Sequence, residues 1–415
     1  RILAQCGGPS LLGRSGSAAE VDEGPALPTT VYKKHSPNSR LALYLSTREF
    51  VLSSNRVSSI DGVVLVDPAY LKDRRIFAMV LLTFRYGRED EEVMGLKFFT
   101  EAILDFKQVY PEGTTTNSGP VEELTVLQQN LIKKLGSDAY PLTLRVSPQA
   151  PPSVRLHPAR PYQGSPLGVS YDLKVFIGER SDEKPQKRDT VRMALRCVQY
   201  AEPAGVPSPP PPTASAHKSF VLCPGRLDVE ATLDKETYHQ GDAIHIHVAI
   251  KNGSSKTVQR VKVAVLQHVH VCMFTHGRFK NIVGSGDTGT GRAVLPGASL
   301  SREFMVRLES CEKFPVALAI ESEFHDAEGY NLSSTTLLAN PKDKNPYGVN
   351  VSYEVKVKAI LSCIDRPIVL RLPFKVVQRR PPEGVVRPPI PKDADCVSED
   401  ISRLVVHSPE VTDIS

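Results

Sequence analysis

Residues 61–96 read DGVVLVDPAYLKDRRIFAMVLLTFRYGREDEEVMGL and carry the strongest structural signal in the chain. Apolar side chains dominate two runs, one on each side of Asp67 and Pro68, and a charged segment that contains glycine follows the second run. Apolar runs bounded by turn-forming residues are typical of β-strands. We therefore expect two strands followed by a mobile, exposed loop.

Length and composition indicate a globular protein of two domains. At 415 residues the chain exceeds the ~250–300 residues at which a single hydrophobic core stops growing. The net charge of +5 is too small for this length to argue for nucleic-acid binding. The seven cysteines are widely spaced, odd in number and without a C-x-x-C pair, which favours a reducing compartment. Because no apolar run approaches the ~18 residues of a membrane span, we expect a cytoplasmic protein.

Two proline-rich segments divide the chain. The first, YAEPAGVPSPPPPTASAHK at 200–218, has no apolar periodicity and predicts an extended hinge. The second begins with RRPPEGVVRPPIP and predicts a flexible regulatory tail at 379–415. We therefore expect an N-domain at 31–199 and a C-domain at 219–378. Residues 1–30 are rich in Gly, Ser and Ala, and we expect them to form a disordered extension.

Alternating apolar residues recur on both sides of this hinge. Many short segments of this kind, separated by Pro and Gly turns, predict an all-β fold of two antiparallel β-sandwich domains. The segments are 41–45, 63–66, 76–84, 171–177 and 191–195 before the hinge, and 227–233, 243–250, 258–265, 304–308, 316–320 and 351–357 after it. Between two of them, residues 252–255 (NGSS) predict a hairpin turn.

One segment, VEELTVLQQNLIKKLG at 121–136, has helical periodicity instead. Pro120 suits the first turn of a helix, and Gly136 suits its C-cap. We expect a single short amphipathic helix in the N-domain. The apolar residues expected on its buried face are Val121, Leu124, Leu127, Leu131 and Leu135.

The patterns that could indicate a metal or cofactor site are better explained otherwise. GSGDTG at 284–289 matches the dinucleotide pattern G-x-G-x-x-G, but the residues after it predict no helix, so we expect a flexible loop. His245-x-His247 and His268-x-His270 each place two imidazoles on one face of a strand, but such pairs are more often solvated histidines than ligands. The hairpin expected at 252–255 would set the first pair opposite Lys262, a poor neighbour for a metal ion. The G-x-S-x-G, H-E-x-x-H and P-loop patterns are absent.

A series of blocks, in order and at similar spacing, resembles the arrestin family. They are VYKKHSPN (31–38), YLSTREF (44–50), IDGVVLVDPAYLKDRR (60–75), FRYGRED (84–90), VMGL (93–96), LIKKLGSDAYPLTL (131–144), APPSVRLHPARPY (150–162), TVRMALRCVQ (190–199), LDKETYHQGDAIHI (233–246), IKNGSSKTVQRVKV (250–263) and VSYEVKVKA (351–359). The resemblance implies two β-sandwich cups joined by a hinge, and a protein that binds an active, phosphorylated seven-helix receptor, such as a rhodopsin, and blocks its G protein. The wording GREDEEVMGLKF at 87–98 and the short tail are most similar to arthropod visual arrestins.

The resemblance also assigns candidate phosphate-binding residues. Clustered cations suit this task because each phosphate brings roughly −1.5 to −2 charge and three acceptor oxygens. The matching basic positions are Lys33, Lys34, Arg48, Lys133 and Lys134.

A buried polar core between the domains is implied as the trigger. Arg192 matches its central arginine, and Glu49 stands at the position of an N-domain carboxylate that is commonly Asp. EDISR at 399–403 resembles E-D-F-A-R of the family, which makes Arg403 the contribution of the tail. The gate loop ALAIESEFHDAEGYNLSS at 317–334 is longer than usual, and its candidate acids, in order of preference, are Asp326, Glu321 and Glu323.

The loop after the second strand matches the segment that enters the receptor's cytoplasmic cavity. Exposed apolar residues at its tip would gain burial there. Its residues are Glu92, Val93, Met94, Gly95 and Leu96.

The tail before Arg403 is acidic and could cover the basic N-domain as an intramolecular competitor of receptor phosphates. Ser398 and Ile401 replace two phenylalanines that are usual there, and no leucine-rich clathrin box is present, which argues against clathrin or adaptor binding. Inositol polyphosphates and acidic phospholipids are further candidate partners, and recruitment to a plasma or photoreceptor membrane is expected.

Two alternatives differ in class. An arrestin-fold trafficking adaptor would bind membrane cargo without phosphate gating and should lack the constellation of Lys33, Lys34 and Arg192. A secreted β-sandwich module for carbohydrate or adhesion would carry disulfide bonds, which the odd cysteine count opposes.

Overall fold

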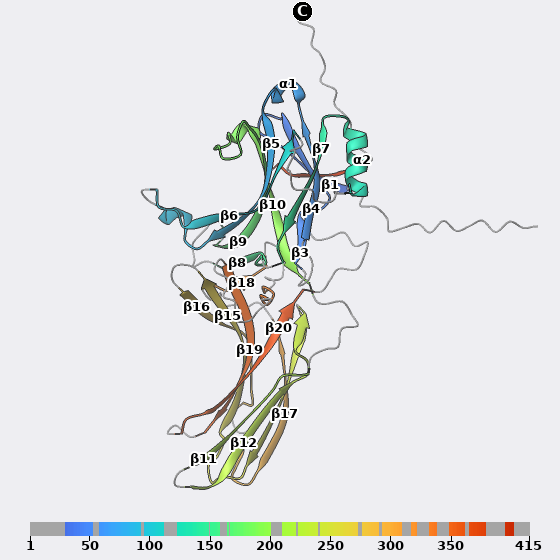
Figure 1. The fold of residues 1–415 in the computed structure, drawn as a ribbon. Helices are drawn as coiled ribbons and strands as arrows, with labels where there is room; N and C mark the ends of the chain where they lie inside the picture. The colour runs from blue at the N-terminus through green and yellow to red at the C-terminus, as the bar shows by residue number, and fades with distance from the viewer. Residues whose placement is uncertain are drawn as a thin grey trace, which may run out of the picture.

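The computed structural model shows the fold in Figure 1. It describes residues 30–52, 58–92, 95–111, 123–148, 150–157, 164–165, 167–200, 210–220, 223–239, 241–272, 276–289, 293–308, 317–321, 332–337, 348–361, 365–378 and 395–401. The expected extension at 1–30 lies outside this set except for Thr30, which begins the first strand. No helix among these residues is long and apolar enough to cross a membrane.

The N-domain is a sandwich of two sheets (Figure 1). The first has the order β21-β1-β2-β4-β7, formed by Val397–Asp400, Thr30–His35, Leu41–Leu45, Ser58–Val66 and Ala139–Val146. The second has the order β18-β8-β9-β10-β3, formed by Ala319–Ile320, Val154–Leu156, Leu167–Gly178, Thr190–Gln199 and Glu49–Leu52. In the same sheet β5 (Arg75–Arg85) pairs with β9 and with β6 (Phe99–Tyr110).

The C-domain is a second sandwich, so the expected all-β fold of two sandwiches is confirmed. One sheet has the order β11-β12-β14-β17, formed by Thr213–Phe220, Cys223–Leu233, Ala243–Asn252 and Ser299–Arg307. The other has the order β13-β20-β19-β15-β16, formed by Thr237–His239, Ile368–Val377, Gly348–Ile360, Arg260–Cys272 and His276–Asp287. Two described pairs, β3 with β10 and β13 with β20, run parallel instead of antiparallel.

The stretch at 61–96 forms β4 and β5 as expected, and β5 is buried on both faces. Its alternate residues from Ile76 to Phe84 enter the main core, while Phe77, Met79 and Leu81 pack with Phe176 on the outer face of the sheet. This double burial explains the nearly unbroken apolar run. Between β4 and β5 the chain forms a short helix, α1 (Pro68–Leu71). Two single turns of 3-10 helix, η1 (Glu89–Glu91) and η2 (Lys187–Asp189), lie in later loops.

Helix α2 (Val126–Leu135) begins later than its periodicity predicts. Thr125 is the N-cap and forms a capping box with Gln128, which fixes the first turn. Leu124 is exposed, and Pro120 and Val121 lie outside the described residues, so the expected start was wrong. The C-cap at Gly136 and the buried face are confirmed, the latter by Leu127, Leu131 and Leu135.

The turn at 252–255 does not form the expected hairpin. β14 before it pairs with β12 and β17, whereas β15 after it pairs with β16 and β19. The turn therefore connects opposite sheets of the sandwich, and the buried Asn252 stabilises it by donating to the carbonyls of Lys256, Val294 and Leu295. His245 and His247 consequently lie beside Glu303 and Ser301 and not beside Lys262.

The hinge and the tail are more ordered than expected. Residues 213–218, assigned to the hinge, are part of strand β11. Four residues of the tail form β21, which lies antiparallel to β1 at the edge of the N-domain. A tail strand that pairs with the first strand of the protein covers a sheet edge that would otherwise present unpaired backbone groups.

Candidate functional site

An interdomain polar cluster lies where the ends of β3 and β10 meet the C-domain. We define it as Glu49, Arg196, Tyr200, Glu321 and Gln378. The parallel pairing of β3 and β10 places Arg196 opposite Glu49, and both residues are at most 6% exposed. The Arg196 guanidinium lies 3.6 Å from a Glu321 carboxylate oxygen and donates a hydrogen bond of 3.2 Å to Gln378. The Tyr200 hydroxyl donates to the Glu49 carboxylate.

The acid of the C-domain in this cluster is Glu321. Burial raises the pKa of its carboxyl, and the nearby Glu49 raises it further, whereas Ser334 and Arg196 act in the opposite direction. Ser334 donates to the carboxylate through its hydroxyl at 2.6 Å and its amide at 3.2 Å. These bonds and the guanidinium keep two buried carboxylates compatible in one small volume.

The expectation that Arg192 is the central arginine was wrong. Its side chain is 44% exposed and pairs within the N-domain with Asp172 at 2.7 Å and Glu101 at 2.9 Å. Arg192 and Arg196 are four residues apart on β10, so their side chains lie on the same face of the strand. The residues between and beside them, such as Met193 and Leu195, point into the main core, so both arginines point away from it. The alternating pattern therefore does not show which arginine is the central one. Of the two, only Arg196 lies opposite Glu49 and near the end of β10, where the chain leaves the N-domain for the C-domain. This closeness to the end of the N-domain was the sequence feature that could have identified Arg196.

The other expected members of the core divide into two groups. Glu49 and Glu321 lie in the cluster, as described above. Asp326, Glu323 and Arg403 lie outside the described residues. Tyr200 and Gln378 were not expected, and nothing in their sequence context signals the role, because the contact depends on a parallel bridge between residues distant in the chain.

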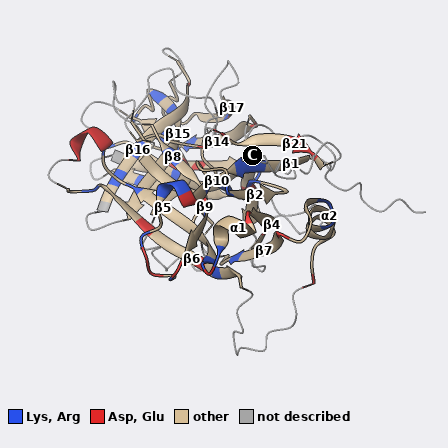
Figure 2. Cartoon of the chain, turned by 90° about the horizontal axis from the view of Figure 1, so that it is seen from above, with Lys and Arg blue, Asp and Glu red and all other residues tan. Residues whose placement is uncertain are grey.

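The acidic tail strand lies over part of the expected phosphate site (Figure 2). β21 pairs with β1 so that Glu399 lies opposite Val31, and its carboxylate is 3.5 Å from the Lys33 ammonium. The Lys134 ammonium donates to the carbonyl of Ile401, whose side chain packs against the cluster that holds α2. Lys133 is exposed beside it. The carboxylate of Glu399 therefore occupies the place that an incoming anion would take at Lys33.

The two lysines of β1 point to opposite faces because they are adjacent on a strand. Lys33 shares its face with Val31 and lies 5.7 Å from the ring centroid of Tyr44. Burial, and to a smaller extent Glu399, raises the pKa of Tyr44 to about 12, which reflects a partly desolvated surface around Lys33. Lys34 lies on the other face of the strand.

Arg48 does not lie on the exposed phosphate surface. Its side chain is 4% exposed and donates to the carbonyl of Ala194 at 2.9 Å. Its guanidinium carbon is 5.8 Å from the ring centroid of Tyr32, which belongs to β1. In this arrangement Arg48 connects β1 to the strand that carries the interdomain polar cluster.

The expected receptor loop follows β5 and projects from the sheet (Figure 1). Leu96 is 64% exposed, and Gly95 has a φ of 79°, which favours glycine. Glu92 instead anchors the base of the loop, since it accepts from Arg85 at 2.8 Å and from the amide of Phe98 at 3.3 Å. Val93 and Met94 lie outside the described residues.

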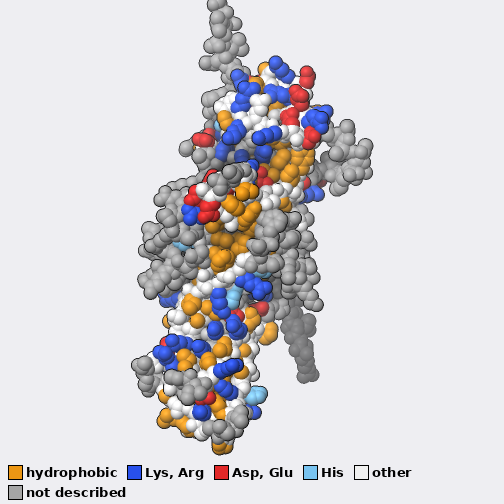
Figure 3. All heavy atoms as spheres, turned by 90° about the vertical axis from the view of Figure 1, so that its left-hand side faces the viewer, with side chains coloured by type: hydrophobic (Ala, Val, Ile, Leu, Met, Phe, Trp, Pro, Cys, Tyr) orange, Lys and Arg blue, Asp and Glu red, His pale blue; other side chains and the backbone are white. Residues whose placement is uncertain are grey.

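A second basic surface, which the sequence analysis missed, lies on the C-domain. A hollow of about 290 Å³ is lined by four lysines and by apolar side chains, namely Lys262, Lys280, Lys356, Lys358, Ala264, Leu266 and Ile282. Burial and the neighbouring cations Lys280, Arg371 and Lys358 lower the pKa of Lys356. Figure 3 shows basic side chains over the C-domain on this side of the molecule, with few acidic ones among them. The alternation of lysines in β19 was the available signal.

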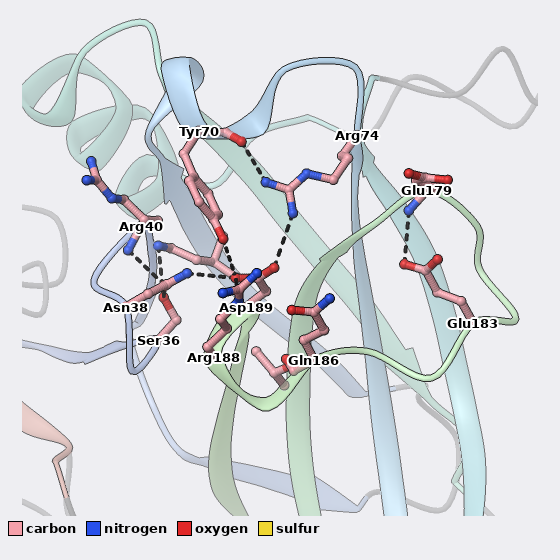
Figure 4. A network of polar contacts seen from close by, with 12 residues as sticks. Ser36, Asn38, Arg40, Tyr70, Arg74, Glu179, Glu183, Gln186, Arg188 and Asp189 are labelled. Atoms are coloured by element: carbon pink, nitrogen blue, oxygen red, sulfur yellow. Dashed lines mark hydrogen bonds and ion pairs between the residues drawn. The ribbon is translucent and has the colours of Figure 1, made fainter.

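A buried aspartate at the far end of the N-domain has a structural explanation (Figure 4). Asp189 is 2% exposed and accepts hydrogen bonds from Asn38 at 2.7 Å, Tyr70 at 2.8 Å and Arg74 at 3.1 Å. These residues come from the turn after β1 and from α1 and the residues after it. The carboxylate therefore joins these segments through three hydrogen bonds.

The histidine pairs do not form a metal site in the part of the chain that the structure describes, where no three His, Cys, Asp or Glu side chains gather at ligand distance. His245 and His268 instead contact the carboxylates of Glu303 and Glu354. His270 contacts the Sγ atom of Cys272 at 3.6 Å.

Comparisons with known proteins give one consistent result. The family model of the arrestin (or S-antigen) N-terminal domain matches residues 41–201, and that of the C-terminal domain matches residues 223–381. An arrestin homolog of Heliothis virescens is 39% identical over 387 residues, covering 92% of this chain and 98% of that protein. The lateral eye arrestin of Limulus polyphemus is 39% identical, covering 85% of each chain. Phosrestin-2 of Calliphora vicina is 36% identical, covering 85% of this chain and 95% of its own.

Proposed function

The chain belongs to the arrestin family, whose members are adaptors and not enzymes, and we propose that it binds the active, phosphorylated form of a seven-helix receptor and blocks G-protein coupling. The observation that carries the proposal is the acidic strand β21 lying on β1 with Glu399 next to Lys33. The lateral eye arrestin among the relatives favours a rhodopsin as the receptor.

Phosphates compete with the tail because they are stronger partners for the same cations. Glu399 brings one negative charge, and its carboxylate lies 3.5 Å from the Lys33 ammonium. A phosphate brings roughly −1.5 to −2 charge and three acceptor oxygens. Several phosphates on a receptor tail would therefore displace β21 and take Lys33, Lys34, Lys133 and Lys134 in its place. The strand edge of β1 would become available at the same moment.

Release of the tail is coupled to the interdomain polar cluster through β1 and Arg48. An exposed ion pair is worth only ~0–1 kcal/mol, whereas removing one partner from a buried ion network costs ~3–5 kcal/mol. Reversing a 1:99 equilibrium takes ~5.5 kcal/mol of differential binding. The buried cluster at Arg196 therefore supplies most of the free-energy difference between the resting and the receptor-bound states, with Arg403 of the tail as its expected further member.

The proposal is tested by binding to light- or agonist-activated receptor with and without prior kinase treatment. We expect clear binding to the phosphorylated receptor and weak binding to the unphosphorylated one. Equal binding to both would favour the alternative, an arrestin-fold adaptor that binds membrane cargo without phosphate gating. In the proposed role the protein resides in the cytoplasm and moves to the receptor membrane.

The receptor loop gives a separate prediction. Leu96→Asp is expected to weaken binding to activated phosphorylated receptor by about ten-fold, because burying a carboxylate in place of a leucine loses apolar contact and adds desolvation. Binding to an isolated phosphorylated receptor-tail peptide should remain unchanged, since that peptide does not reach the loop. A loss of peptide binding in this variant would contradict the assignment of Leu96 to the loop that enters the receptor cavity.

Acidic headgroups or inositol polyphosphates are proposed as ligands of the C-domain lysine hollow. Lys356→Gln combined with Lys358→Gln is expected to lower the affinity for inositol hexakisphosphate by about a hundred-fold or more, since two charge-assisted hydrogen bonds of ~1.5–3 kcal/mol each are lost. Isothermal titration calorimetry measures this change. Lys251→Gln, an exposed lysine on the other sheet of the C-domain, is the control. Equal losses in both proteins would show that total charge, not the hollow, governs binding.

A further inference from the structure

The gate-loop segment 317–321 is hydrogen-bonded on both of its edges. Toward the N-domain, β18 pairs with β8, which places Ala319 opposite Leu156. Two flanking bonds connect the amide of His157 to the carbonyl of Leu318 at 2.8 Å, and the amide of Ala317 to the carbonyl of His157 at 2.9 Å. Backbone groups of a strand point alternately to its two edges, so the amide and carbonyl of Ala319 face the C-domain.

Gln267 of β15 meets both of these groups. Its carboxamide is 0% exposed, donates to the carbonyl of Ala319 at 2.8 Å and accepts from the amide of Ala319 at 2.9 Å. It also donates to the hydroxyl of Tyr353 at 2.9 Å. The side chain therefore acts as a partner strand would, with one donor and one acceptor directed at the same residue. The amide of Ser333 also donates to the Ala319 carbonyl at 3.0 Å, so the bond that depends on Gln267 alone is the one from the Ala319 amide.

The strand register at Ala319 determines the position of Glu321, the acidic residue that follows it in the chain. Glu321 follows two residues later and is the C-domain carboxylate beside Arg196. A β-strand residue shifted by one position points to the opposite face. A segment that slipped or detached at Ala319 would therefore remove Glu321 from the guanidinium without any change in the acid itself.

We propose that Gln267 is a positioning residue for the interdomain polar cluster, because its carboxamide holds residues 317–321 in the register that presents Glu321 to Arg196. The inference rests on the proposed function, since it assumes that this cluster restrains receptor binding. In this proposal, backbone hydrogen bonds between the domains, as well as the charges of the cluster, restrain the protein from binding receptor. Residue 267 lies in the C-domain core, and its side-chain hydrogen bonds among the described residues are with Ala319 and Tyr353.

The test is the phosphate dependence of Gln267→Met, which keeps side-chain size but removes both bonds to Ala319. We expect the variant to bind activated, unphosphorylated receptor at least about five-fold better than the parent protein, because the buried amide of Ala319 loses its partner and the carbonyl keeps only the bond from the Ser333 amide at 3.0 Å, which weakens the hold on the segment. Arg196→Glu serves as the positive control. Asn252→Leu is the matched control, since it removes an equally buried amide of the C-domain far from the cluster.

The possible outcomes distinguish a failure of the positioning role of Gln267 from a failure of the proposed function. If Arg196→Glu releases phosphate dependence and Gln267→Met, folded by circular dichroism, keeps it, the positioning role is wrong and the proposed function stands. If Arg196→Glu also keeps it, the proposed function itself fails. An increase in Asn252→Leu equal to that in Gln267→Met would reject the specific role, because loss of stability alone would then explain both.

A second variant approaches the segment from the N-domain, in case Gln267→Met does not fold. His157→Pro removes the amide that donates to Leu318 and leaves the C-domain core intact. It is expected to increase binding to unphosphorylated receptor in the same direction. Unchanged phosphate dependence in this variant would overturn the proposal that the two-sided pairing of residues 317–321 restrains the protein.

Discussion

Arg196→Glu is expected to bind activated receptor that carries no phosphate. The substitution places a third carboxylate beside Glu49 and Glu321 and removes the only cation that the described contacts place against Glu321. Breaking a buried ion network costs ~3–5 kcal/mol, and every ~1.4 kcal/mol is a factor of ten in an equilibrium constant. Binding to unphosphorylated receptor should therefore rise by about a hundred-fold in a pull-down or surface-based assay.

Arg192→Glu is the matched control for this experiment. The residue is the same type on the same face of the same strand, but its partners Asp172 and Glu101 lie within the N-domain and its side chain is 44% exposed. The phosphate requirement should persist in this variant. If Arg192→Glu and Arg196→Glu behaved alike, the position between the domains would have no special role.

Replacing Lys33 and Lys34 together by alanine is expected to abolish most binding to the phosphorylated receptor. Each charge-assisted hydrogen bond to a phosphate contributes ~1.5–3 kcal/mol, so two lost contacts predict a fall of a hundred-fold or more in affinity. Lys33→Ala also removes the ion pair with Glu399, but a partly exposed pair of this kind is worth only ~0–1 kcal/mol. The gain from a loosened tail is therefore smaller than the loss of phosphate contacts.

Lys184→Ala combined with Lys187→Ala, two exposed lysines at and before η2, is the control for net charge because it removes the same two charges. Affinity measured with a phosphorylated receptor-tail peptide at two salt concentrations separates the effects. The double variant should lose both affinity and salt dependence, and the control should keep both. A double variant with parental affinity would show that β1 is not where phosphates bind.

Most strands and the helix could be predicted from the local residue pattern, and the predictions that failed have identifiable physical causes. Alternation predicted β9, β10, β12 and β19, because each strand has to bury one face. β4 and β5 were predicted from apolar runs bounded by turn residues, and the run in β5 is nearly unbroken because both of its faces are buried. The start of α2 was placed too early because the apolar period continues to residue 121, while the capping box at Thr125 fixes the first turn. The turn at 252–255 was taken as a hairpin because turn-forming residues do not reveal which sheet the next strand joins.

The site was less predictable, because its geometry comes from contacts between distant parts of the chain. The lysines of β1 and the acidic tail could be proposed from charge and resemblance, and the structure brings Lys33 and Glu399 together. The central arginine was chosen wrongly, since Arg192 and Arg196 share a strand face, and it is the pairing with β3, close to the chain crossing into the C-domain, that distinguishes Arg196. The role of Gln267 could not be predicted from the sequence, because the residue pattern of its strand does not reveal that the side chain is buried against the distant segment 317–321.

The measurement that tests the account most directly is hydrogen exchange of the backbone amides at 397–400, followed by mass spectrometry, in the full-length protein. β21 pairs with β1 in the resting state, so these amides should exchange slowly without receptor. Saturating activated, phosphorylated receptor should abolish this protection, and unphosphorylated receptor should leave it nearly intact. Protection that persists while phosphorylated receptor is bound would contradict the claim that receptor phosphates displace the tail from β1.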